Sequence, residues 1–300
     1  MISTQLDKKI ILEISRILGP IPAKETILAV LGYKTSRLGV HPNYYKSIIN
    51  IFKKFDIKYV IGNYRYTYKL DIGKGGWSNK FGDEAYINDE NAFGDYFFYI
   101  ADSINKAKVT RDNEESEKEA EFGETLGIPL CCAEFYVDNA DRAMKKQNDF
   151  VTLVLENTYS DPPYNYWNNY VSQYFGFSLL SFFPCSFDCK ESVIVSEQIY
   201  SILFDIYPEF ADQFLYYHKQ NILYTEYRGI YLFEKTKYEN GRIIYNNSRI
   251  HSSIKNSSIY KLIMQSNNLA IYNKNHCAFS NRMKILKELK GENIALCLFN

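Results

Sequence analysis

The apolar positions in the first third of the chain recur at helical spacing and then change to a strand-like pattern. Apolar residues three or four positions apart predict helices at Thr4–Leu18, Ala23–Leu31 and Tyr44–Phe55. Aromatic and β-branched residues then dominate, which predicts strands at Lys58–Gly62, Tyr64–Leu70 and Phe97–Ala101. The first third therefore reads as a mixed α/β region.

The middle of the chain is predominantly helical by the same criterion. Ala107–Leu126 carries a dense run of charges, which is typical of one solvated helix face. Pro129 and Pro184 each stand where a helix is expected to begin, since proline suits a first helical turn. The predicted helices of this region are Ala107–Leu126, Pro129–Met144, Ser186–Tyr207 and Glu209–Gln220.

From Gly229 onward the pattern is that of short antiparallel strands. Ile230–Phe233 and Ile243–Tyr245 flank Asn240-Gly241, a pair that favours the type I′ turn of a hairpin. Further strands are expected at Leu269–Tyr272 and Ile294–Phe299, with a short helix at Met283–Leu289 between them. The predicted fold class is α+β: a helical cysteine-bearing core, a mixed N-terminal α/β region and a C-terminal antiparallel β region.

The change of pattern along the chain predicts three regions. They are an N-terminal α/β region at 1–95, a helical domain with the cysteine motifs at 96–225, and a β-rich region at 226–300, or one continuous domain.

Composition and charge narrow the function classes. The chain has 300 residues, with 35 basic and 35 acidic side chains. The chain has no excess of positive charge with which to bind a phosphate backbone, so nucleic acid is not an expected partner. No stretch has the apolar length of a membrane span, and Met1–Leu18 lacks the pattern of a signal peptide. These features predict a cytoplasmic protein that does not bind membranes.

Four of the six cysteines form two pairs of similar design. Cys131 and Cys132 follow Pro129 in G-I-P-L-C-C, and Cys185 and Cys189 follow Pro184 in P-C-S-F-D-C. In a cytoplasmic chain, paired cysteines indicate metal ligands or redox thiols rather than disulfides. Both pairs are expected at a helix start, where free N–H groups and the helix dipole stabilise thiolates.

The spacing within each pair bears on which cofactor would fit. Four residues apart on a helix, Cys185 and Cys189 would lie on one face. Adjacent residues point about 100° apart, so Cys131 and Cys132 are expected to share one small ion only with a distorted backbone. Four thiolates suit tetrahedral zinc, whereas an iron–sulfur cluster is wider and accepts less regular placement. Three alternatives therefore stay open: an iron–sulfur cluster, a zinc ion, and thiols that bind no metal.

Several other residues are candidate helpers or packing residues. Glu134, Asp188 and Glu191 are carboxylates close to the cysteines in sequence, and Ser186 is expected to cap a helix. Cys277 and Cys297 stand alone, as is typical of cysteines that pack as small apolar residues. The glycine-rich Gly73–Trp77 loop lacks the pattern that binds nucleotide phosphates.

The cysteine motifs resemble those of a prokaryotic domain-of-unknown-function family. That family joins a G-[YI]-P-x-C-C element to a P-C-S-[FW]-x-C element. Here the matching stretches are Gly123–Phe135 and Pro184–Ser192, and the resemblance covers about Phe97–Gln220. It implies that the paired cysteines form the site, and it implies no particular activity.

Three functional hypotheses follow from these residues. The first is a metal- or iron–sulfur-dependent enzyme that holds its cofactor on the four paired cysteines and acts on a small molecule or peptide in a pocket of Tyr and Phe side chains. The second is a non-catalytic protein in which the same cysteines form a structural zinc or thiol clasp while the β-rich region binds a partner. The third is a metal-free enzyme with a cysteine nucleophile, for which His218 is the candidate base.

Overall fold

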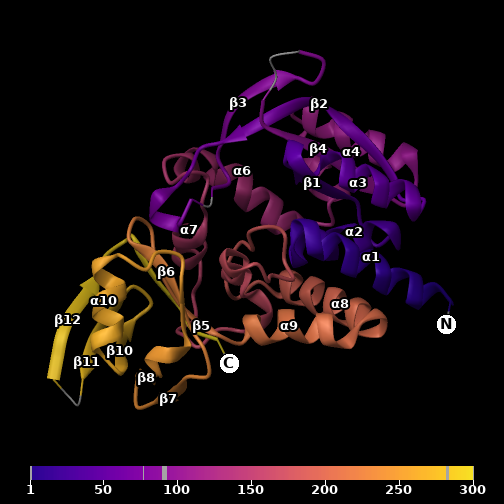
Figure 1. The fold of residues 1–300 in the computed structure, drawn as a ribbon. Helices are drawn as coiled ribbons and strands as arrows, with labels where there is room; N and C mark the ends of the chain where they lie inside the picture. Colours follow the sequence, from indigo (N-terminus) through magenta and orange to yellow (C-terminus); the bar gives the residue numbers. More distant parts are fainter. Residues whose placement is uncertain (1, 77, 90–92, 282–283, 300) are drawn as a thin grey trace. The chain divides into compact units, whose positions relative to one another are not determined.

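The fold of the chain was taken from a computed structural model, drawn in Figure 1, which describes residues 2–76, 78–89, 93–281 and 284–299. Trp77 and Met283, which belong to the predicted loop and the predicted C-terminal helix, lie outside this part. The chain divides into two compact units. Unit 1 comprises Met1–Lys69, Asn79–Asp138 and Gln198–Ala211, and unit 2 comprises Leu70–Ser78, Asn139–Glu197 and Asp212–Asn300. Helices and antiparallel sheets occur in both, which confirms the α+β class.

Unit 1 contains a four-stranded antiparallel sheet with the order β1-β4-β2-β3. Its strands are β1 (Ser36–Val40), β2 (Lys58–Tyr68), β3 (Phe81–Tyr86) and β4 (Asp95–Ala101). The two strands predicted between Lys58 and Leu70 are one long strand, in which an irregularity between Ile61 and Arg65 shifts the register against β4. Such bulges bend a strand without ending it.

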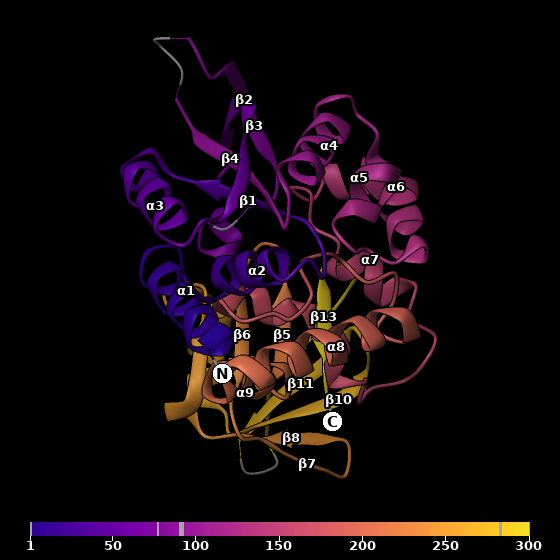
Figure 2. The same ribbon diagram turned by 90° about the vertical axis from the view of Figure 1, so that its right-hand side faces the viewer.

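Helices cover both faces of this sheet, because β4 presents large apolar residues to each side in turn. Phe98 meets Phe52 of α3 (Pro42–Lys54), with ring centroids 5.7 Å apart. On the other face, Phe97 and Tyr99 cluster with Ala107 of α4 (Ile104–Glu115). Figure 2 shows α3 and α4 on opposite sides of the sheet.

The remaining helices of unit 1 largely follow the sequence pattern. They are α1 (Ile2–Leu18), α2 (Pro20–Val30) and α5 (Glu119–Thr125). The prediction of one continuous helix at Ala107–Leu126 is wrong in one respect. The structure has two helices there, and the chain between α4 and α5 is not helical, because Glu117 adopts a φ of 56°. A left-handed residue cannot continue a right-handed helix.

Unit 2 contains two antiparallel sheets, as predicted for the C-terminal region. One sheet has the order β13-β5-β6-β9 and the other β12-β11-β10-β8-β7. The strands of the first are β5 (Asn221–Thr225), β6 (Gly229–Phe233), β9 (Ile250–Ser252) and β13 (Ile294–Cys297). Those of the second are β7 (Lys237–Glu239), β8 (Arg242–Ile244), β10 (Asn268–Asn273), β11 (His276–Asn281) and β12 (Lys284–Lys290).

One apolar core joins both sheets to α10 (Ser258–Gln265). Tyr231 and Leu296 come from the first sheet, Leu269 and Phe279 from the second, and Ile263 from the helix. All five side chains are fully buried. The same unit contains the short helix α7 (Val151–Glu156) and the 3₁₀ turns η1 (Ile72–Lys74), η2 (Tyr166–Asn168), η3 (Tyr170–Phe175) and η4 (Asn247–Arg249).

Two predictions for the C-terminal region are wrong in detail. Asn240 and Gly241 do form the expected turn, with φ angles of 50° and 72°, but the strand that this turn joins to β8 is β7 rather than Ile230–Phe233. The helix expected at Met283–Leu289 is strand β12, which pairs with β11. Because β12 is an edge strand with mostly exposed side chains, its residues carry little periodicity by which to distinguish strand from helix.

Three longer helices continue from residues of one unit into residues of the other. They are α6 (Leu130–Met144), α8 (Lys190–Ile206) and α9 (Pro208–His218). Within the described ranges, none of the helices combines the length and the apolar character that crossing a bilayer requires.

Candidate metal centre

Cys131 and Cys132 lie in the first turn of α6, as the sequence predicts. The carbonyl of Pro129 accepts hydrogen bonds from the N–H groups of Cys132 and Ala133, at 2.9 and 3.0 Å, so the helix begins at once after the proline. Cys131 is exposed to solvent, whereas Cys132 is 1% exposed. Their Sγ atoms are 3.9 Å apart on this helical backbone, so the distortion expected for two adjacent ligands is not required.

Cys185 and Cys189 lie in a turn that precedes α8, and the prediction that they share a helix face is wrong. The helix begins at Lys190, not at Ser186. The N–H of Cys189 donates to the Ser186 carbonyl at 3.2 Å, and the Cys189 carbonyl accepts from Val193 at 3.3 Å. Cys189 therefore ends a tight turn and leads directly into the helix.

Two side chains from residues 158–168 account for the late start of α8. The amide of Asn168 donates to the carbonyls of Phe187 and Cys189, at 2.9 and 3.0 Å. The hydroxyl of Thr158 accepts from the Phe187 N–H at 2.9 Å. With these backbone groups bound from outside, residues 186–189 have their polar atoms satisfied without becoming helical.

The four paired cysteines converge. Their Sγ atoms all lie within 4.8 Å of one another, which is close enough for them to bind one metal ion. Cys132 and Cys189 are buried, at 1% and 6% exposed. A cluster of four thiols with this spacing suits thiophilic metals such as zinc and iron.

The predicted helper residues take different roles. Glu134 and Glu191 are exposed side chains on α6 and α8. The hydroxyl of Ser186 accepts from the Asp188 N–H at 3.2 Å, so it stabilises the turn and does not cap α8. The carboxylate of Asp188 accepts from the N–H groups of Tyr159 and Ser160, at 3.0 and 2.9 Å, and so holds the neighbouring loop in place.

The two remaining cysteines and the candidate base His218 are packing residues. Cys277 is fully buried among apolar side chains, and burial raises the pKa of its thiol to about 12. Burial, and then the charge of Asp149, raise the pKa of Cys297 still further. The Nε2 of His218 accepts from the Leu179 N–H at 2.8 Å, so its Nδ1 donates to the Tyr166 carbonyl at 3.0 Å. Neither ring nitrogen is left for a thiol.

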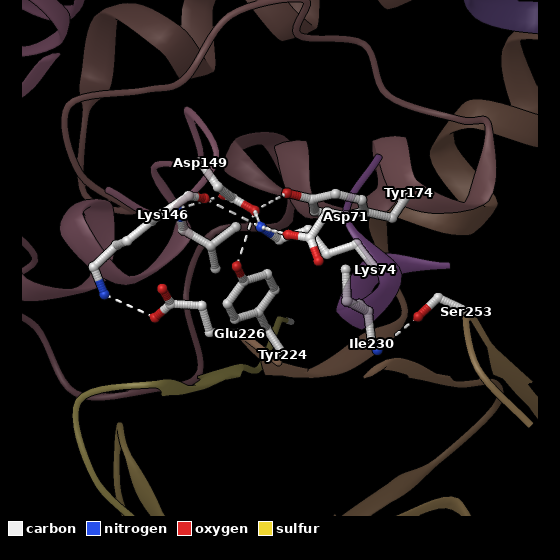
Figure 3. A network of polar contacts seen from close by, with 10 residues as sticks. Asp71, Lys74, Lys146, Asp149, Tyr174, Tyr224, Glu226, Ile230 and Ser253 are labelled. Atoms are coloured by element: carbon white, nitrogen blue, oxygen red, sulfur yellow. Dashed lines mark hydrogen bonds and ion pairs between the residues drawn. The ribbon is translucent and has the colours of Figure 1, made fainter. Parts of the chain in front are cut away.

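Unit 2 also contains a buried ionic network that the sequence did not predict, and Figure 3 shows it from close by. The ammonium of Lys74 lies 2.8 Å from the carboxylate of Asp71 and 2.9 Å from that of Asp149. The same Asp149 carboxylate accepts hydrogen bonds from the phenols of Tyr174 and of Tyr224, the latter at 2.9 Å. The lysine and Asp149 are each only 3% exposed.

The charges of this network are balanced by mutual contact rather than by water. Burial acts to lower the pKa of Lys74, but Asp149 and Asp71 outweigh it and the net shift is upward. Burial and the Asp149 charge hold the pKa values of Tyr174 and Tyr224 well above their usual range. At neutral pH the lysine is therefore charged and the phenols are neutral donors.

Two glycines allow the Lys74 loop to approach its neighbours in unit 2. A Cβ on Gly73 would stand 2.8 Å from the Cα of Tyr227. Gly75 has a φ of 71°, and a Cβ there would stand 2.6 Å from the carbonyl oxygen of Ser253. In the sequence these glycines indicated only a loop, because a buried charge in contact with distant residues leaves no local pattern.

The fold and the cysteine cluster define the class: an α+β protein with four thiols placed closely enough to bind a metal ion. No family model, curated protein or solved structure was found to match the chain. The membership indicated by the G-I-P-L-C-C and P-C-S-F-D-C motifs therefore stays a prediction.

Proposed function

We propose that Cys131, Cys132, Cys185 and Cys189 bind a single zinc ion with all four thiolates. The observation that carries the proposal is the mutual spacing of the sulfurs, all within 4.8 Å. With Zn–S bonds of about 2.3 Å, two thiolates of a tetrahedral site stand about 3.8 Å apart. The 3.9 Å between the sulfurs of Cys131 and Cys132 agrees with that value.

The same spacing supports a single ion over an iron–sulfur cluster. In a four-iron cluster each thiolate binds a different iron at the outside of the cluster, so the four sulfurs stand farther apart than they do around one ion. Four sulfurs within 4.8 Å leave little room for such a core. An iron–sulfur enzyme is therefore the less favoured of the metal hypotheses.

A site with four cysteine ligands supports a structural function rather than a catalytic one. Catalytic zinc keeps one position open for water or substrate, whereas structural zinc is closed by four protein ligands. We infer that the ion acts as a clasp that connects the start of α6 to the turn before α8. When bound, the zinc would supply fixed tetrahedral bonds, and the chain would supply the four thiolates.

The experiment is a measurement of metal content on the protein purified without oxygen. The proposal expects about one zinc per chain, no colour, and slow alkylation of Cys132 and Cys189 until a chelator is added. Cys277→Ala is the matched control, since this buried cysteine lies outside the cluster and its loss leaves the zinc content unchanged.

Two other results would each reject the zinc clasp. Iron and sulfide with broad visible absorbance would favour the iron–sulfur enzyme. A metal-free chain whose Cys131 thiol is alkylated rapidly would favour the cysteine-nucleophile enzyme, for which the exposure of Cys131 is the supporting observation.

A further inference from the structure

A pocket in unit 2 lies beside the turn that carries Cys185 and Cys189. Its volume is about 410 Å³, and its lining comes from residues 160–168 and 187–194. Phe187, Val193 and Ile194 supply an apolar part of the wall. Cavities of roughly 300–1,000 Å³ with an apolar wall and a few polar groups are typical of small-molecule sites.

Two charges of opposite sign line this pocket without a partner. The side chain of Lys190, the first residue of α8, forms no ion pair or hydrogen bond with any residue that the structure describes, and the same holds for the side chain of Asp161. The third charged residue of the lining, Asp188, is already engaged by the backbone of Tyr159 and Ser160. One ammonium and one carboxylate are thus left to meet a ligand.

A buried phenol gives a second and independent indication of a ligand. Tyr164 lines the pocket and is 2% exposed, yet its hydroxyl has no hydrogen-bond partner in the described part of the chain. Burial raises the pKa of this phenol, and the carboxylates of Asp188 and Asp161 raise it further. A buried polar group normally has a partner, and a ligand oxygen would supply one.

We propose that this pocket binds a small zwitterion of the amino-acid type with an apolar side chain. The ligand carboxylate pairs with Lys190, the ligand ammonium pairs with Asp161, and the side chain packs on Phe187 and Val193. The hydroxyl of Tyr164 donates to a ligand oxygen. The proposal goes beyond the zinc clasp and does not depend on which metal the cysteines bind.

The test is isothermal titration calorimetry on the full chain with its metal content determined. The probes are L-leucine and L-phenylalanine, compared with N-acetyl-L-leucine, which lacks the ammonium, and L-leucinamide, which lacks the carboxylate. We expect saturable binding of the free amino acids and at least roughly tenfold weaker binding of both derivatives, as for the loss of a charged hydrogen bond.

Variants assign the binding to this pocket. Lys190→Met and Asp161→Asn are each expected to weaken binding by about tenfold or more. Lys261→Met and Glu191→Gln are matched controls, because each removes an exposed helix charge that is not itself part of the pocket lining. Tyr164→Phe is expected to weaken binding about fivefold without lowering the melting temperature, since the hydroxyl has no protein partner to lose.

Three outcomes would overturn the proposal. The first is the absence of any binding heat for both amino acids. The second is equal affinity for L-leucine and its two derivatives. The third is binding that Lys190→Met and Asp161→Asn leave at the level of the controls. Each of these can occur with zinc fully bound, so failure here is distinct from failure of the clasp.

Discussion

The cysteine centre and the Lys74 network satisfy their polar groups in opposite ways. The cysteines bring four thiols within 4.8 Å of one another, an arrangement that as thiolates needs a cation from outside the chain. The network supplies its own cation, because the ammonium of Lys74 lies within 3 Å of two carboxylates. The first region can therefore respond to metal supply, whereas the second is complete as soon as the chain has folded.

This difference distinguishes a candidate functional site from a structural feature of the fold. Both regions gather residues that are distant in sequence, and both contain buried polar side chains. Of these two regions, the cysteine cluster is the one whose four thiols are spaced to hold a metal ion, so it is the candidate for metal binding. A buried, fully paired charge network is a structural feature that can be mistaken for an active site.

Removing the cation of the network is expected to have the largest effect on stability. Lys74→Met leaves Asp71 and Asp149 buried without their counter-charge, which should lower the free energy of unfolding by about 3–5 kcal/mol. Denaturant titration measures this, with Lys261→Met as an exposed control expected to change it by less than about 0.5 kcal/mol. A loss of under about 1 kcal/mol would show that water reaches the carboxylates.

Removing one cysteine ligand is expected to lower the affinity of the cysteine centre for zinc. Cys132→Ser should weaken zinc binding by more than about 100-fold, because even residues that only support ligands cost up to this factor. Competition with a chromophoric chelator measures the affinity. Unchanged affinity in this variant would mean that Cys132 is a packing residue and the clasp has at most three ligands.

The two regions are expected to differ in their response to pH. Zinc binding should weaken from neutral pH to about pH 5, since protons compete for the thiolates. The pKa of Lys74 is raised in the folded state, so its contribution to stability is present below the ordinary lysine pKa of 10.5 and is lost only as pH rises through the folded-state pKa.

The pH measurement compares the wild type with Lys74→Met in chelator, followed by the wild type with zinc. The stability difference caused by Lys74 should be level between about pH 6 and pH 9. A Lys74 contribution that falls within this interval would contradict the upward shift of its pKa.

The docking of the Lys74 loop gives a smaller but geometrically specific prediction. Gly73→Ala places a Cβ 2.8 Å from the Cα of Tyr227, so the backbone must shift at a cost of about 1–3 kcal/mol. Gly123→Ala in α5 is the matched control, because its Cβ would have no neighbour nearer than 3.5 Å. Equal stability of the two variants would show that the loop does not pack closely on residues 226–227.

The smallest effects are expected for the acidic side chains near the cysteines. Glu134→Gln and Glu191→Gln should leave zinc affinity unchanged within about threefold, because both carboxylates are exposed. The chelator competition used for Cys132→Ser measures this as well. A tenfold loss in either variant would restore a supporting role for that carboxylate.

The cysteine site was predictable from sequence to a degree that the Lys74 network was not. Two cysteine pairs that each follow a proline form a local pattern, and such pairs of thiols have few common roles. Lys74 shows no comparable pattern: its glycine-rich stretch indicates only a loop, and its partner Asp149 is 75 residues away.

Predictions from the local sequence pattern were also wrong where tertiary contacts determine the backbone conformation. The turn at 185–189 reads as helix in sequence, and it is kept from being helical by Asn168 and Thr158. Strand β12 carries apolar and charged residues compatible with a helix, and pairing with β11 makes it a strand. The first three helices of unit 1 were better predicted, since the apolar positions of α1, α2 and α3 recur at helical spacing.

The Lys74 network has a consequence for dividing this protein into parts. Unit 2 includes residues 70–78, which lie between two segments of unit 1 in the sequence and carry the cation that Asp149 requires. A fragment that starts at residue 139 would retain both β-sheets and α10, yet it would have an uncompensated carboxylate in its interior. Successful dissection would therefore need complementation by a peptide of residues 70–78, added in trans.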